Sequence, residues 1–219
     1  LSIILCIALA IGIIPVSQKV MASGEEDGVY YVSATGSAEA DGKTQSTPVD
    51  KLSTALDKIK ADGNNVAGKN VTIKIDGTQG NVTYDMTEHA CNITYMSLGE
   101  TRAKINLNKN NDRHMELFGP SVFDTIDFVT SYNSSSATNA RRIFAGNNEV
   151  VLRNVNYYRN TSTILERSNE YIALVAGSYN KNAGESVPGT TLRISNTVVD
   201  TYSSRASVYI GGTYCASNR

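Results

Sequence analysis

A pattern of the form apolar–x–polar–apolar–x–apolar recurs three times and constrains the fold more than any other feature of the chain. The copies run from Phe123 to Phe128, from Leu152 to Tyr157 and from Ile194 to Val199. Each follows an apolar run closed by glycine, at 117–119, 144–146 and 175–177, and a fourth such run stands at 209–212. Repetition of this kind predicts stacked units that share one core.

Inside the second and third copies, Asn154 and Asn196 occupy the polar central position. Asparagine tolerates left-handed backbone angles, and its side chain can bond to its own backbone. We therefore expect a strand, a sharp bend and a second strand at each copy. The spacing between copies is irregular, with an evident insertion from Ser178 to Gly189, so loops of different length should leave these corners.

The rest of the chain reads as many short strands and one helix. Val71, Ile73 and Ile75 alternate with polar residues, as in a half-buried strand. The pattern predicts a helix over 48–61, with Thr47 as N-cap, an apolar stripe of Leu52, Leu56 and Ile59, and Gly63 as the stop. Other β-type runs are expected at 29–33, 93–98, 103–107, 115–118, 123–129, 149–158, 171–176, 190–199 and 207–210.

So many strands with almost no helix between them exclude a doubly wound fold. The expected fold class is all-β, a right-handed parallel β-helix (solenoid) with an N-terminal capping strand and an amphipathic helix. A β-sandwich is the alternative. The expected domains are a capping segment at 23–68 and the β-helix at 69–219, truncated at its C-terminus.

The N-terminal run from Leu1 to Pro15 is almost wholly apolar but short for a membrane span. Small residues around Val20–Ala22 then predict a signal peptide over 1–22, so the mature chain is expected to be secreted or on the cell surface, with no membrane span. A retained membrane anchor is the alternative. Because the chain starts with Leu1 rather than Met, we expect it to be a fragment.

The segment Tyr31–Ser37, followed by Asp41–Gly42, Thr47–Val49 and the helix, resembles the start of many secreted right-handed parallel β-helix proteins of the pectate-lyase-like kind. The glycine-closed runs and Phe123–Phe128 are similar to segments of large surface proteins and adhesins of Gram-positive gut bacteria. The resemblance implies an exported protein whose first turn is covered by the strand and the helix. Polysaccharide lyases share this start, so the resemblance implies a fold rather than an activity.

The leading functional hypothesis is a non-catalytic, adhesin-like extracellular protein that binds carbohydrate or a host or cell-wall surface. The alternative is a polysaccharide lyase or glycoside hydrolase whose catalytic part lies beyond Arg219. A structural stalk is a third reading.

Candidate surface-binding residues are Arg153, Tyr158, Arg159 and Arg193, since tyrosine can stack on sugars and arginine can pair with acidic groups. The opposing reading places Tyr157 in the core and the arginines in solvent. Asp124 and Asp127 flank a bend, where aspartate more often caps a turn than catalyses a reaction, and no catalytic residue is assigned.

No cofactor or metal is expected: His89 and His114 stand without Cys or Glu at ligand spacing. Nucleic acid is not an expected partner, because no concentrated basic patch is present. After cleavage two cysteines remain, Cys91 and Cys215, and whether they pair is left open. The oligomeric state is also left open.

Overall fold

The computed structural model describes residues 25–77, 81–83, 88–106, 114–116, 119–130, 141–144, 148–159, 172–175, 179–180, 191–200, 206–209 and 214–215. The predicted signal peptide, 1–22, lies outside these residues.

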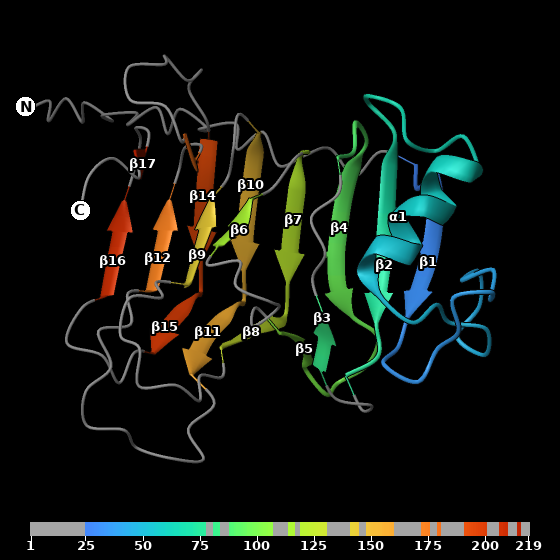
Figure 1. Cartoon of the computed structure of the whole chain (residues 1–219), viewed down its shortest axis with the longest axis horizontal. Helices are drawn as coiled ribbons and strands as arrows, with labels where there is room; N and C mark the ends of the chain where they lie inside the picture. The colour runs from blue at the N-terminus through green and yellow to red at the C-terminus, as the bar shows by residue number, and fades with distance from the viewer. Residues whose placement is uncertain are drawn as a thin grey trace, which may run out of the picture.

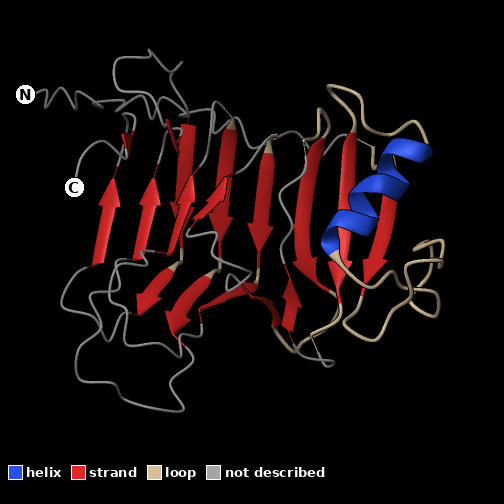
Figure 2. Cartoon of the chain, in the orientation of Figure 1, coloured by secondary structure: helices blue, strands red, loops and turns tan. Residues whose placement is uncertain are grey.

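One helix and a series of short strands make up the described part of the chain (Figures 1 and 2). The helix is α1 (Leu52–Ala61). The strands are β1 (Gly28–Val32), β2 (Asn70–Ile75), β3 (Asn81–Thr83), β4 (Asn92–Ser97), β5 (Ala103–Asn106), β6 (His114–Glu116), β7 (Ser121–Asp124), β8 (Ile126–Thr130), β9 (Arg141–Phe144), β10 (Glu149–Arg153), β11 (Asn156–Arg159), β12 (Ile172–Val175), β13 (Tyr179–Asn180), β14 (Thr191–Ser195), β15 (Val198–Asp200), β16 (Ala206–Tyr209) and β17 (Tyr214–Cys215).

These strands form parallel sheets. The largest has the order β1-β2-β4-β7-β10-β14, a second has the order β15-β11-β8-β5-β3, and a third has the order β16-β12-β9-β6. In addition, β13 pairs with β17. Within the six-stranded sheet, the length of chain between paired strands varies. Asn70 pairs with Asn92, whereas Glu149 pairs with Thr191, which lies much farther along the chain.

Register aligns the inward side chains into rows that cross the sheets. Tyr30, Ile73, Tyr95, Phe123 and Leu152 are successive partners across the six-stranded sheet, and all are fully buried. In the second sheet, the adjacent partners Ile105, Phe128 and Tyr157 form a similar row. The buried position of Tyr157 confirms the reading that assigned it to the core. Burial of these rows supplies the main stabilising free energy of the fold.

Helix α1 contributes to the same core. Its apolar stripe is buried as predicted, with Leu52, Leu56 and Ile59 joined by Ala55. Its end is also as predicted: Gly63 has φ +71°, its N–H bonds to the carbonyl of Lys60, and the N–H of Asn64 bonds to that of Ile59. These two bonds form a Schellman motif, which satisfies the last carbonyls of the helix.

The predicted helix start was wrong by four residues, because the helix begins at Leu52 and not at Pro48. Val49 is held in extended backbone by β1: its N–H bonds to the carbonyl of Tyr31, and its carbonyl accepts from the N–H of Ser33. Thr47 does not cap the helix but donates its hydroxyl to Asp41. Pairing with β1 therefore outweighs the local Thr–Pro start signal.

The same segment covers the free edge of β1. Val49 bridges Val32, and the carbonyl of Gly42 accepts the N–H of Tyr31. An uncovered edge strand is a template for aggregation, and this loop occupies it.

A polar cluster fastens this loop to the end of α1. The Tyr30 hydroxyl donates to Asp62 at 2.6 Å, and Asn64 donates to that hydroxyl at 3.1 Å. Lys43 pairs with Asp62, and its Nζ lies 4.1 Å from the centre of the Tyr30 ring. Hydrogen bonds from Lys43 and Tyr30 lower the pKa of Asp62, and burial raises the pKa of Tyr30.

Most predicted strands are confirmed, but four were missed: β3, β9, β13 and β17. Three of the predicted runs each contain two strands, since 123–129, 149–158 and 190–199 are divided by the bends at Thr125, Asn154 and Asn196. The missed strands are two to four residues long. A run that short carries no clear alternation in sequence.

The expected fold class, an all-β right-handed parallel β-helix, is wrong. The described residues form parallel sheets together with a helix whose apolar stripe belongs to the same core, a mixed arrangement of the α/β type. A sequence repeat reports in-register parallel pairing but not how the chain passes from one sheet to the next. Segments that would complete the turns of a solenoid, such as 107–113, 131–140 and 160–171, lie outside the described residues.

The β-sandwich alternative is also wrong, because every pair of strands in the described part of the chain is parallel and a sandwich is built from antiparallel sheets. The predicted domain boundary at 68/69 stays a prediction.

Replacing Leu56 by alanine should lower the free energy of unfolding by about 2–5 kcal/mol, because it leaves a cavity between α1 and the sheet. The matched control is Asp57→Ala on the exposed side of the same helix, where a change within about 0.5 kcal/mol is expected. Urea denaturation followed by circular dichroism measures both. Equal effects of the two variants would contradict the placement of α1 on the core.

Candidate functional site

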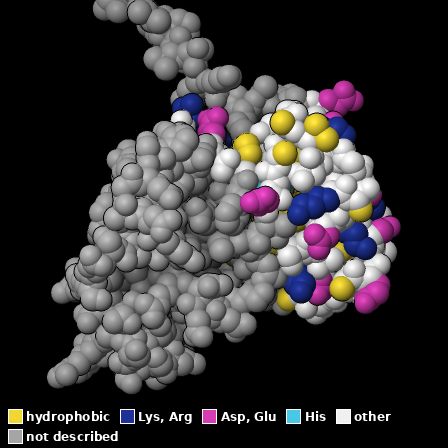
Figure 3. All heavy atoms as spheres, turned by 45° about the horizontal axis from the view of Figure 1, so that its top comes forward, with side chains coloured by type: hydrophobic (Ala, Val, Ile, Leu, Met, Phe, Trp, Pro, Cys, Tyr) yellow, Lys and Arg dark blue, Asp and Glu magenta, His cyan; other side chains and the backbone are white. Residues whose placement is uncertain are grey.

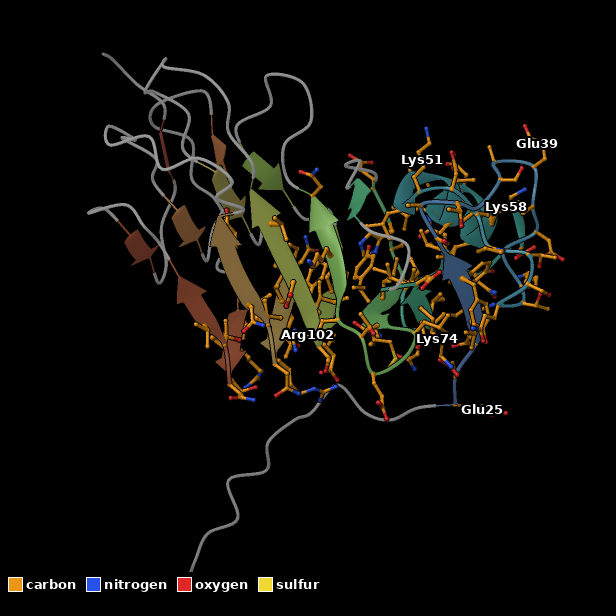
Figure 4. All side chains as sticks on the ribbon, turned by 90° about the horizontal axis from the view of Figure 1, so that it is seen from below. Glu25, Glu39, Lys51, Lys58, Lys74 and Arg102 are labelled. Atoms are coloured by element: carbon orange, nitrogen blue, oxygen red, sulfur yellow. The ribbon has the colours of Figure 1, made fainter. Side chains whose placement is uncertain are left out.

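The outward side of the six-stranded sheet, called the outer face below, carries the two predicted binding arginines that can be placed. It lies on the side of the molecule opposite α1, since Lys74 of β2 points away from Lys51 and Lys58 of the helix (Figure 4). Register gives two rows of side chains on it. The first is Tyr31, Lys74, Met96, Asp124, Arg153 and Ser195; the second is Val29, Thr72, Thr94, Val122, Val151 and Arg193.

Each of the two arginines pairs with an acid on the preceding strand. Arg153 of β10 bonds to Asp124 of β7 through Nε at 3.0 Å and a terminal nitrogen at 2.8 Å. Arg193 of β14 bonds to Glu149 of β10 through Nε at 2.9 Å. The arginine side chains remain 46% and 50% exposed, so both guanidinium groups are fixed in place and still reach solvent.

The other two predicted residues, Tyr158 and Arg159, belong to β11 in the five-stranded sheet. Their side chains lie outside the described part of the structure. The four candidates are therefore divided between two sheets, and only Arg153 and Arg193 stand on adjacent strands of one face.

The corners between the first two sheets are built as the sequence pattern predicted. Asn154 has φ 54° and Asn196 has φ 43°, both left-handed. The equivalent residue of the first copy is Thr125, with φ 56°. A β-branched residue tolerates this conformation poorly, so Thr125 is strained where the two asparagines are not.

The two bend aspartates, Asp124 and Asp127, both accept hydrogen bonds at the corners. Asp124 accepts hydrogen bonds from Thr125, Arg153 and Asn154. Burial raises the pKa of Asp124, but these bonds outweigh burial and hold its pKa below the usual value. Asp127, 7% exposed, accepts from Arg102 at 2.5 Å and from Asn156 at 2.9 Å. These partners are side chains rather than backbone N–H groups, so the turn-capping reading of the two residues stays a prediction.

Sequence reasoning missed Arg102 as a structural residue. Its guanidinium bonds to Asp127 and, through Nη2, to the carbonyl of Ile126 at 2.9 Å and to that of Asn154 at 2.5 Å. One side chain thus links the corners at Thr125 and Asn154. Only the pairing register brings these groups together, so no local sequence signal could have found the contact.

Charges of both signs are interspersed over the described part of the end of the molecule that carries α1 (Figure 3). Among the residues that the structure describes, no three His, Cys, Asp or Glu side chains gather in a metal-like cluster. No helix in the described ranges is long and apolar enough to cross a bilayer. Cys91 is free and buried, whereas the side chain of Cys215 is outside the described set.

Substituting Thr125 by asparagine should raise the free energy of unfolding by about 1 kcal/mol, because asparagine adopts the left-handed conformation more readily than threonine. Thr125→Val, which keeps the β-branch and loses the hydroxyl bond to Asp124, should lower it. The midpoints of urea denaturation test both. A stability ranking with valine above asparagine would show that the bend is not strained.

No protein family, curated protein or solved structure matches the chain. The resemblance to pectate-lyase-like and adhesin-like proteins therefore stays a prediction.

Proposed function

We propose that the protein is a non-catalytic, adhesin-like extracellular protein that binds surface glycans through its outer face. The observation that carries this proposal is the pair Arg153 and Arg193, both exposed and placed diagonally on the adjacent strands β10 and β14. A sheet face with solvent-reaching donors held by ion pairs suits recognition of an extended ligand.

The chemistry of the arginines supports a polar or acidic ligand. The Arg193 guanidinium bonds to Glu149 through Nε, and its side chain is 50% exposed. A guanidinium presents N–H groups in a planar fork that matches a carboxylate and also donates to hydroxyl groups. Asp124 and Glu149 hold the two side chains in place, which lowers the entropy lost on binding.

The dimensions of the outer face suit a chain-like ligand. Neighbouring strands lie about 4.8 Å apart, so the row from Tyr31 to Ser195 spans about 24 Å. At its far end Tyr31 faces Lys74, whose Nζ lies 5.9 Å from the ring centre. An aromatic ring and a cation at one end, and two arginines at the other, give separate contacts for successive sugars.

The extracellular part of the proposal rests on the sequence. It follows from the predicted signal peptide over 1–22, which lies outside the described residues. Secretion of a reporter fused to these residues would support it, and retention of the uncleaved fusion inside the cell would count against it.

Binding of the purified chain to immobilised polygalacturonate, hyaluronan and neutral mannan tests the outer face directly. Arg153→Ala and Arg193→Ala together should weaken binding to the bound glycan at least about tenfold, equivalent to about 1.4 kcal/mol. Lys51→Ala, on the side that carries α1, is the matched control and should leave binding unchanged (Figure 4). Undiminished binding by the double arginine variant would contradict the proposal.

A further inference from the structure

His89 is a buried side chain that neither the fold nor the proposed function explains. It is 6% exposed, and its Nδ1 lies 3.0 Å from the carbonyl oxygen of Cys91. A carbonyl only accepts, so Nδ1 carries the proton and Nε2 keeps a lone pair. Nε2 is buried and makes no hydrogen bond to the described residues.

The ring lies where the starts of two neighbouring strands meet. A Cβ on Gly119 would lie 2.3 Å from the Cε1 and Nδ1 atoms of His89, so the backbone before β7 packs directly on the ring. Just beyond, the N–H of Ile93 in β4 bonds to the carbonyl of Pro120 at 3.0 Å. The N–H of Asn92 bonds to Lys69 at 2.9 Å, and that of Ala90 bonds to Asn65 at 2.7 Å.

The charges around the ring would not compensate a proton on it. Lys60, in the last turn of α1, is the charged group that acts on His89 from the helix. Just before β4, the Cys91 thiol is kept neutral because burial, and to a smaller extent the charge of Asp27, raises its pKa. Glu88, the neighbouring acid in the chain, is exposed, and no carboxylate in the described residues bonds to the ring.

We propose that His89 is an acid-sensitive joint, which holds the starts of β4 and β7 together while its ring is neutral and releases them when the ring binds a proton. A proton on Nε2 creates a buried N–H donor and a buried positive charge beside Lys60. Such a group is expensive to bury without a partner, so the ring moves to water and Gly119 loses the surface on which it packs. This inference does not depend on the proposed glycan binding.

The direction of the pH dependence follows from burial. Burial lowers the pKa of His89, and Lys60 adds to the effect against the opposing contribution of the Cys91 carbonyl. The open state therefore binds the proton more tightly than the closed state. The closed joint has its full stability above about pH 6.5, the ordinary value for histidine, and loses stability as the pH falls below it.

Hydrogen exchange measured by NMR at pH 7.5 and pH 5.0 tests the joint. After correction for intrinsic rates, the amides of Asn92 and Ile93 should lose protection at pH 5.0, by up to about thirtyfold, because an open ring with the ordinary pKa of about 6.5 is almost fully protonated there. The amide of Thr125, bonded to Arg153 in a distant corner, should keep its protection. Carboxylates remain largely ionised over this range, so histidine is the group that titrates.

Three variants test whether His89, rather than another group, causes the pH dependence of amide protection. His89→Gln should make the protection of Asn92 and Ile93 independent of pH, and His114→Gln should leave the acid response unchanged. Lys60→Met removes the neighbouring charge and should reduce the response, which keeps the test decisive if His89→Gln fails to fold. The chain has only two histidines, so His114→Gln also assigns the ring signals.

An ordinary His89 titration near pH 6.5 with unchanged exchange at Asn92 and Ile93 would overturn the proposal. So would an equal loss of protection at pH 5.0 in wild type and His89→Gln.

Discussion

In-register parallel pairing of inward apolar side chains is the constraint on which the described structure depends. Parallel register places each inward residue beside the inward residue of the next strand, and the result is visible in the stacking of Tyr95 on Phe123. Their ring centres lie 4.7 Å apart, with the planes 8° from parallel. Phe123 meets Phe128 edge to face at 5.0 Å, and this contact joins the first sheet to the second. A slip of one residue would turn every one of these rings outward.

The polar structure at the corners follows from the same register. Because the bends are stacked, the Asn196 amide donates to Asn154 at 2.7 Å, and the Asn154 amide donates to Asp124 at 3.2 Å. Arg102 reaches the corners from the side and donates to the carbonyls of Ile126 and Asn154. The cation–acid pairs on the outer face use the same alignment, since each arginine reaches an acid on the neighbouring strand. The core, the corners and the candidate site therefore all depend on the same parallel register.

Sequence reasoning succeeded where the signal was local. Alternation at Val71, Ile73 and Ile75 identified β2, and the asparagines at 154 and 196 identified left-handed bends, because each residue type reports its own backbone preference. It failed where a distant partner decided the outcome. Val49 was expected inside the helix but pairs with β1, and the pattern of repeats was extended to a parallel β-helix that the described residues do not form. For the site, exposure of Arg153 and Arg193 was foreseen in one reading, but their acid partners on neighbouring strands were not.

The length of chain between paired strands is not constant, and this bears on how the chain tolerates insertions. From the pair Asn70 and Asn92 to the pair Glu149 and Thr191, the length of chain between partners nearly doubles while the parallel register is kept. The entropic cost of closing a flexible loop rises only with the logarithm of its length, about 0.6 kcal/mol for each doubling. Burial of a single leucine outweighs that cost. The connections can therefore gain residues by insertion while the rows of buried side chains keep their alignment.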